Sequence, residues 1–201
     1  MTAGRHKLDQ GKSQIQSNVL SMARKAHTAI EHAMTSLESQ DAGIARQVID
    51  EDREVNELLR IIESECLNLL ALHQPEASDL REVIGYMQIA TEIERVADHA
   101  KDISKIVLGM DASDFSGPME QLAKMSDTAL EMLSQLLEAL ENGDAELATT
   151  AASCDDEIDD LDEEACSSLM MQVMTTADPS MRATHLLWIA YHLERIGDRL
   201  T

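Results

Sequence analysis

Apolar residues recur every three or four positions along nearly the whole chain, with only short polar breaks between the periodic segments. This spacing places the apolar side chains on one face of an α-helix, whereas a half-buried strand alternates at every second position. The pattern therefore predicts six helices, each long enough to pack along a neighbour. They cover residues 13–39, 42–73, 79–108, 118–141, 145–176 and 179–201.

The polar breaks contain residues that typically begin helices. Asp41 and Asp144 each precede a periodic segment, where an aspartate can accept hydrogen bonds from the first free backbone N–H groups. Ser78 and Asp178 are assigned the same role before the third and sixth segments. Since Asp41 corresponds to Asp144 and Ser78 to Asp178, the same order of helices and breaks occurs twice.

This repetition predicts an all-α protein that contains two tandem antiparallel three-helix bundles. Short connections make successive helices antiparallel, so each bundle closes around its own apolar faces. The simplest arrangement places the two bundles side by side. We expect a flexible N-terminus at 1–12, the first bundle at 13–110, a linker at 111–117 and the second bundle at 118–201.

The residue composition favours helices over sheets, and the net charge limits which molecules can be partners. The chain has 12 Met but only one Trp, two Tyr and one Phe, and sheets favour aromatic residues. The formal net charge of −22 repels nucleic-acid phosphates, so we expect no nucleic acid as a partner. Cations, or proteins with a basic face, are the expected partners.

Nothing in the sequence predicts a membrane segment or a leader. No apolar run approaches the 18 residues typical of a membrane-spanning helix, so no direct membrane insertion is expected. The polar N-terminus lacks the apolar stretch of a signal peptide. The chain is therefore expected to be cytoplasmic. Its three cysteines also lack the C-x2-C spacing of a zinc site.

One acidic pattern occurs twice, at an offset of 100 residues. The stretches TEIERVADHAKDI and HLERIGDRLT align Glu94 with Glu194 and Asp98 with Asp198. In both helices these acids lie opposite an apolar stripe, on a face that is apolar further towards the N-terminus. Side chains four positions apart on a helix have Cβ atoms about 5–6 Å apart, so each pair can share a cation.

The preceding helix in each half carries a matching acid inside its own apolar stripe. Asp52 and Asp155 interrupt these stripes, and Asn56 and Asp159 follow one turn later. If the fifth and sixth helices face each other, four carboxylates gather between them. Such a cluster requires protons, basic side chains or metal to neutralise it, and oxygen ligands suit Mg²⁺, Ca²⁺, Mn²⁺ or iron.

Two alternatives remain open from the residues alone. The acids can be solvated or paired with Arg95 and Arg195, which describes a structural helical adaptor without a specific metal. A metal-dependent helical-bundle enzyme is the other alternative, although no Glu-x-x-His typical of di-iron oxidases occurs. Among the neighbouring histidines, His99 is a candidate ligand, and His192 is interpreted as an edge or surface residue.

The two acidic motifs, together with the segment RQVIDEDREVNELLRIIESECLNLLALHQPEASDLREV at residues 46–83, resemble the PhoU family of phosphate-specific transport system accessory proteins. The resemblance extends from about residue 14 to residue 201. It implies a cytoplasmic, non-enzymatic regulator that binds the ATPase of the phosphate ABC transporter and the phosphate-sensing histidine kinase. It further implies that both partners are held inactive when phosphate is plentiful.

The resemblance also implies metal ions on the acidic motifs, with iron, Mg²⁺, Mn²⁺ and Zn²⁺ as candidates. The set implied in the second repeat is Asp155, Asp159, Glu194 and Asp198. The set implied in the first repeat is Asp52, Asn56, Glu94 and Asp98, with Asp102 and His99 as additional candidates.

The chain departs from the family pattern at several positions. Asn56 replaces an acid, so the first site should hold metal less strongly, and Asp102, where the family often has Asn, offers partial compensation. Arg199 replaces the histidine that His99 supplies in the first copy. The sequence ends at Thr201, inside the second motif, so we expect a longer natural chain.

We also expect a homodimer, because the third and sixth helices carry apolar residues on two faces. Packing between the two bundles fits the same pattern.

Overall fold

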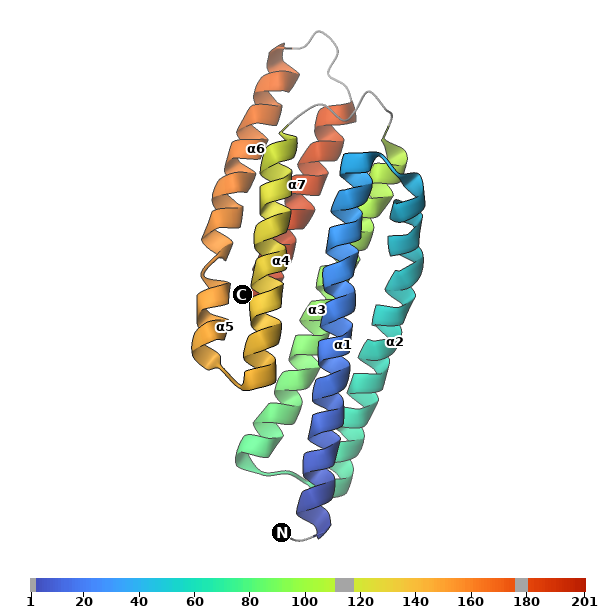
Figure 1. Ribbon diagram of the computed structural model, residues 1–201, viewed down its shortest axis with the longest axis vertical. Coiled ribbons are helices and arrows are strands. Elements are labelled where there is room, and N and C mark those ends of the chain that lie inside the picture. Colours follow the sequence, from blue (N-terminus) through green and yellow to red (C-terminus); the bar gives the residue numbers. More distant parts are fainter. Residues whose placement is uncertain (1–2, 111–117, 176–180) are drawn as a thin grey trace.

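The computed structural model describes residues 3–110, 118–175 and 181–201, and these residues form helices connected by short turns (Figure 1). No strand occurs among them. The helices are α1 (Ala3–Ser39), α2 (Ala42–His73), α3 (Ala77–Gly109), α4 (Met119–Asn142), α5 (Ala145–Ala152), α6 (Asp155–Thr175) and α7 (Met181–Leu200).

The helices form two bundles that lie side by side, as the repeat predicts. Helices α1, α2 and α3 pack against one another in the first bundle, and α4 packs against α5, α6 and α7 in the second. The two bundles meet where α3 packs on α7 and α1 packs on α4 (Figure 1). The all-α fold with two antiparallel bundles is therefore confirmed.

Helix α3 is apolar on two faces because it has helices on more than one side. It packs against α1, α2 and α7, so its stripe of Ile93, Val96 and Ile103 is buried. Towards its N-terminus, Leu80 and Ile84 lie beyond this packing and are partly exposed. Packing between the bundles thus accounts for much of the second apolar face.

The fifth predicted helix is present as two segments, α5 and α6, with a short interruption between them. At the interruption the N–H of Ser153 donates to the carbonyl oxygens of both Thr149 and Thr150, at 3.3 and 3.2 Å. The N–H of Cys154 donates to the carbonyl of Ala151 at 3.1 Å, which is a tighter turn than the α-helix. The break places Asp155 in the first turn of α6, where the helix dipole favours negative charge.

The first helix begins at Ala3, ten residues before the predicted start at 13. The separate N-terminal segment expected at 1–12 is therefore part of α1 over residues 3–12. Two kinds of contact hold this extension against the rest of the bundle. Leu8 is buried, and Arg5 and Lys12 form ion pairs with Asp79 of α3 at 2.5 and 2.8 Å.

Two of the predicted helix caps are confirmed and one is wrong. Asp41 accepts hydrogen bonds from the backbone at the start of α2, and Asp144 does so at the start of α5. Ser78 lies inside α3, which begins one residue earlier after Glu76. The ion pairs of Asp79 fix this end of α3 in place of a side-chain cap. Asp178 and the predicted linker at 111–117 lie outside the described residues.

Besides the start of α3, two regions of the surface carry several exposed apolar side chains. One is the end of α2, where Leu67 and Leu72 are exposed. The other is the second bundle, where three methionines near the end of α6 and two aromatic residues of α7 are exposed: Met170, Met171, Met174, Trp188 and Tyr191. Within the described ranges, none of the helices has a stretch apolar and long enough to cross a membrane.

The ion pairs of Asp79 should make the stability of the fold depend on pH in the acidic range. Hydrogen bonds from Lys12 and Arg5 lower the pKa of the Asp79 carboxyl from its usual 3.8. A lowered native pKa stabilises the fold above the unfolded pKa, and this contribution is lost as pH falls through 3.8 and below. Asp79→Asn should therefore lower the thermal midpoint at pH 7, and the difference from the natural chain should shrink at pH 3. Circular dichroism melting curves measure both effects.

Glu38→Gln, a change at an exposed acid of the same bundle, is the matched control and should leave the midpoint unchanged at both pH values. An Asp79→Asn midpoint equal to that of the natural chain at pH 7 would contradict the role assigned to these ion pairs.

Candidate functional site

The structure brings together the four acids expected in the second repeat. Asp155 and Asp159 lie one turn apart on α6, which packs along α7 with its Glu194 and Asp198. Burial raises the pKa of Asp155 to about 6, and the nearby charges of Asp159, Asp198 and Glu194 add to this rise. The site is therefore a group of like charges in which Asp155 and Glu194 are partly buried.

Asp155 has an unsatisfied oxygen inside this group. Its Oδ1 atom is buried and has no hydrogen-bond partner among the described residues. The oxygen lies close to α7 because residue 197 is glycine: a Cβ there would stand 2.4 Å from Oδ1 of Asp155 and 2.9 Å from Cδ1 of Ile158. A buried carboxylate oxygen without a partner is uncommon and favours a bound proton or cation.

Arg195 neutralises part of the group. Its guanidinium forms ion pairs with Glu194 and, at 2.8 Å, with Asp198, and it lies 5.5 Å from the centre of the Tyr191 ring. The alternative in which arginine pairs with neighbouring acids thus applies to these two residues. Asp155 and Asp159 make no ion pair within the described part of the chain, so the group keeps excess negative charge.

The four residues expected in the first repeat are also brought together, but an ammonium group lies among them. Lys101 Nζ is 2.9 Å from Asp52 Oδ2 and donates a hydrogen bond to Asp98. The amide of Asn56 donates to the same oxygen of Asp52 at 2.9 Å. Burial raises the pKa of Glu94, and the charges of Asp98 and Asp52 raise it further. Here a lysine provides the positive charge.

Lys101 is the functional residue that the sequence analysis missed. It lies three positions after Asp98, on the same helical face as Glu94, so helical spacing alone could have identified it. At the offset of 100 residues its counterpart in the second repeat is Thr201, whose side chain carries no charge. The two repeats therefore share three of their acids but differ in the cation that neutralises them.

The two additional candidates of the first repeat make other contacts. Asp102 forms an ion pair with Lys105 at 2.7 Å. His99 Nδ1 lies 3.0 Å from Nδ1 of His192, across the contact between α3 and α7. Burial lowers the pKa of both imidazoles. His192 is thus part of the contact between the bundles, which corrects its interpretation as an edge or surface residue.

The donor atoms fit a metal differently in the two repeats. In the described ranges, no three His, Cys, Asp or Glu side chains converge closely enough to form a ready metal site. The second repeat offers oxygen donors, one of them buried and unsatisfied, so it fits a hard cation or iron after side-chain rotation. In the first repeat Oδ1 of Asp52 is likewise buried without a partner among the described residues, but Lys101 already neutralises this aspartate. The first repeat therefore does not fit a metal while Lys101 occupies it.

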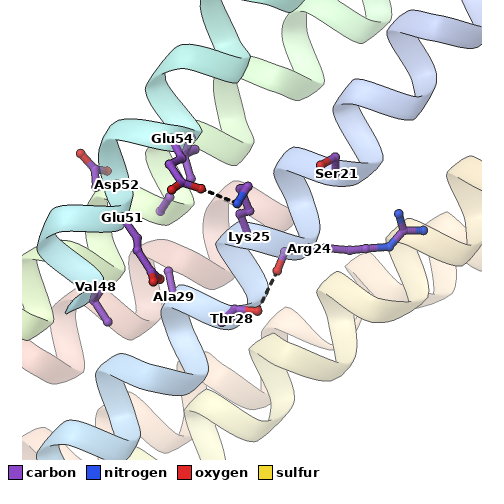
Figure 2. A pocket seen from close by; sticks show the side chains of 11 residues that line it. Ser21, Arg24, Lys25, Thr28, Ala29, Val48, Glu51, Asp52 and Glu54 are labelled. Atoms are coloured by element: carbon purple, nitrogen blue, oxygen red, sulfur yellow. Dashed lines mark hydrogen bonds and ion pairs between the residues drawn. The ribbon is translucent and has the colours of Figure 1, made fainter. Parts of the chain in front are cut away.

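A hollow of about 330 Å³ lies between α1 and α2, close to the first acidic group (Figure 2). Arg24 and Lys25 line it, and two cations beside a hollow are a feature of anion sites. Lys25 reaches Glu54 (Figure 2), with which it forms an ion pair at 2.6 Å. Arg24 forms an ion pair with Glu141 of α4 at 2.5 Å. Because both cations are neutralised and Asp52 also lines the hollow, an anion gains little there.

Comparison with known families identifies the same domain in both halves of the chain. A family model described as the PhoU domain matches residues 19–107 and again residues 122–201. A Streptococcus pneumoniae protein, named as a phosphate-specific transport system accessory protein PhoU homolog, is 32% identical over 195 residues, which cover 96% of this chain and 90% of the relative. A Pseudomonas putida protein of the same name is 32% identical over 92% of this chain and 73% of the relative.

Solved structures show the same fold. The crystal structure of the phosphate transport system regulatory protein PhoU from Streptococcus pneumoniae matches with a TM-score of 0.89 and 30% identity, over 96% of this chain and 91% of that chain. PhoU from Pseudomonas aeruginosa matches with a TM-score of 0.90 and 27% identity, over 96% of this chain and 92% of that chain. The resemblance inferred from the two motifs is therefore confirmed.

The raised pKa of Asp155 predicts a second pH effect, of opposite sign to that of Asp79. Because the native carboxyl holds its proton up to about pH 6, ionisation destabilises the fold as pH rises through the interval from 3.8 to about 6. In metal-free protein at pH 7, Asp155→Asn should raise stability by about 1–2 kcal/mol, allowing for solvent screening. Urea unfolding at pH 7 and at pH 4 measures the gain, which should largely vanish at pH 4.

Asp156→Asn removes the neighbouring exposed acid and is the matched control, with little expected effect. Equal gains in the two variants would point to relief of general charge repulsion and not to the buried oxygen.

Proposed function

Because the chain belongs to the PhoU family, we propose that it regulates phosphate uptake and phosphate-starvation signalling. Relatives that share this fold along nearly the whole chain are named as phosphate-specific transport accessory proteins. The match of the family domain to both halves is the observation that carries the proposal. The role is regulatory and non-catalytic.

The proposed partners are the ATPase of the phosphate ABC transporter and the phosphate-sensing histidine kinase. The regulator binds them in the cytoplasm and holds both inactive while phosphate is plentiful. A net charge of −22 and exposed apolar side chains on α6 and α7 suit binding to proteins with basic surfaces. The proposal includes a homodimer, for which the exposed start of α3 offers apolar surface.

We further propose that the second repeat binds one metal ion, with Asp155, Asp159, Glu194 and Asp198 as its ligands. The unsatisfied oxygen of Asp155 and the excess of carboxylates over arginine support this assignment. Iron, Mg²⁺, Mn²⁺ and Zn²⁺ are the candidates. When bound, the ion would neutralise the carboxylates between α6 and α7 and so stabilise the contact between these helices.

In the first repeat, the ammonium of Lys101 takes the place of a metal ion. It contacts Asp52 and Asp98, the two residues that are equivalent to Asp155 and Asp198. Asp102 and His99 are kept out of any ligand set by their contacts with Lys105 and His192. The proposal therefore assigns one metal ion to each chain.

Metal stoichiometry tests this assignment. Equilibrium dialysis of the chelator-treated full chain against Mn²⁺ should show one tight equivalent, and Asp155→Asn should weaken it at least tenfold. Lys101→Met should add a second equivalent, because Asp52 and Asp98 lose their internal cation. Lys124→Met removes an exposed lysine of α4, away from both acidic groups, and is the control, with one equivalent expected. An unchanged stoichiometry in Lys101→Met would contradict the role of that ammonium.

The regulatory role is tested by alkaline phosphatase activity in phosphate-rich medium, in a bacterium that carries this gene. Deletion of the gene should raise the activity, and the natural gene should restore repression. A gene with Glu194→Ala and Asp198→Ala should fail to restore it, at normal protein level, because the metal-binding face is lost. Continued repression in the deletion strain would contradict the proposed function, and repression restored by the double variant would make the acids dispensable.

A further inference from the structure

The solvent face of α6 changes character along its length. Residues separated by four, three, four, three and four positions point in nearly the same direction from a helix. Six exposed residues of α6 have this spacing: Asp156, Asp160, Glu163, Ser167, Met170 and Met174. One continuous face is therefore acidic over its first half and apolar over its second.

The acidic half is extreme even for this chain. Eight of the first ten residues of α6 are Asp or Glu, and the helix contains no Lys, Arg or His. On the outer face, Asp156, Asp160 and Glu163 make no ion pair with the described part of the chain. Three like charges on successive turns repel one another, so this half of the face gains from a cationic partner.

The apolar half is unusual for a solvent-exposed helix. Met170 is 57% exposed and Met174 is 87% exposed. Methionine is unbranched and polarisable, and it is frequent on surfaces that adapt to partner proteins. The neighbouring helix α7 also exposes Trp188 and Tyr191, and aromatic residues are enriched in protein interfaces. A face that only contacts water has no use for exposed methionine and aromatic side chains, so a partner surface explains them better.

We propose that this face of α6 binds a basic amphipathic helix or extended segment of a partner protein. Apolar side chains of the segment cover Met170 and Met174, while its Lys or Arg side chains pair with Asp156, Asp160 and Glu163. Between Asp156 and Met174 the face is about 27 Å long at 1.5 Å per residue. A helical partner of about five turns fits this length. The inference specifies a partner chemistry for the proposed regulator and rests on that function.

Charge argues for a basic partner over a second copy of the chain. Each copy has 38 acidic and 16 basic residues, and α6 itself has no base to offer to the acids of another α6. A parallel pairing would oppose acid to acid. An antiparallel pairing would oppose the methionines of one copy to the acids of the other. A segment with basic and apolar halves matches both halves of this face at once.

The test uses the full chain labelled with ¹³C at the methionine methyl groups, and a synthetic peptide as the probe. The peptide has 18 residues. The face that contacts α6 carries Lys along one half and Leu along the other. The methyl signals of Met170 and Met174 should shift on titration, whereas those of buried Met22 and Met132 should not. A peptide of the same composition in scrambled order, without the two halves, should bind at least tenfold more weakly.

Matched variants separate this face from general attraction to an acidic protein. Asp160→Asn with Glu163→Gln, and separately Met170→Ser with Met174→Ser, should each weaken peptide binding at least tenfold. Asp127→Asn with Glu138→Gln removes two exposed acids of α4, and Leu67→Ser with Leu72→Ser removes two exposed apolar side chains of α2. Both control pairs should change the affinity less than twofold.

Two outcomes would overturn the inference. Equal weakening in the α6 variants and the controls would show non-specific attraction. Self-association, measured by light scattering and abolished by the α6 variants alone, would make a second copy the occupant of this face. This experiment measures peptide binding alone, separately from phosphatase repression in cells. If the peptide fails to bind while the gene still represses phosphatase, the docking face is rejected and the proposed function stands.

Discussion

A carboxylate that leaves water for the space between two helices loses hydration worth several kcal/mol unless a cation, a proton or hydrogen-bond donors replace it. Both repeats contain such carboxylates at equivalent positions, because each has an aspartate inside the apolar stripe of its second helix. In the first repeat Lys101 and Asn56 both donate to Oδ2 of Asp52, and Lys101 neutralises its charge, although its Oδ1 atom is buried without a partner among the described residues. In the second, Asp155 also has a buried Oδ1 without a partner, makes no ion pair with the described residues, and its pKa rises to about 6. The second repeat, in which no internal cation reaches the buried aspartate, is therefore the one with capacity for an external cation.

This difference links the packing of the second bundle to its proposed function. Gly197 lets α7 approach Asp155 and Ile158 closely, and the break at Ser153 places Asp155 in the first turn of α6. The contact between α6 and α7 thus depends on how the charge of Asp155 is neutralised. The outer face of the same α6 carries the acids and methionines that we assign to a partner. The proposed metal ion on the inner face and the proposed partner on the outer face would therefore both act on α6.

Much of the fold follows from local patterns that a sequence displays directly. Helical periodicity and caps such as Asp41 predict the helices, and the internal repeat predicts the two bundles. The two acidic motifs predict the sets of acids that the structure brings together. The remaining features depend on distant contacts. The start of α1 at Ala3 depends on an ion pair between Arg5 and Asp79, and the position of His192 on its contact with His99 of the other bundle. Helical spacing places Lys101 beside Asp98 on α3. Its pairing with Asp52 of α2 depends on the packing of the two helices.

Amide hydrogen exchange of the full chain, with Mn²⁺ and after chelation, tests most directly the claim that the two repeats satisfy their buried carboxylates differently. Exchange is followed in peptides from α6 and α7 and compared with peptides from α2 and α3. Mn²⁺ is expected to slow exchange in α6 and α7 and to leave α2 and α3 unchanged, because Lys101 already provides the cation in the first repeat. Equal slowing in both repeats, or no slowing in either, would contradict this difference between them.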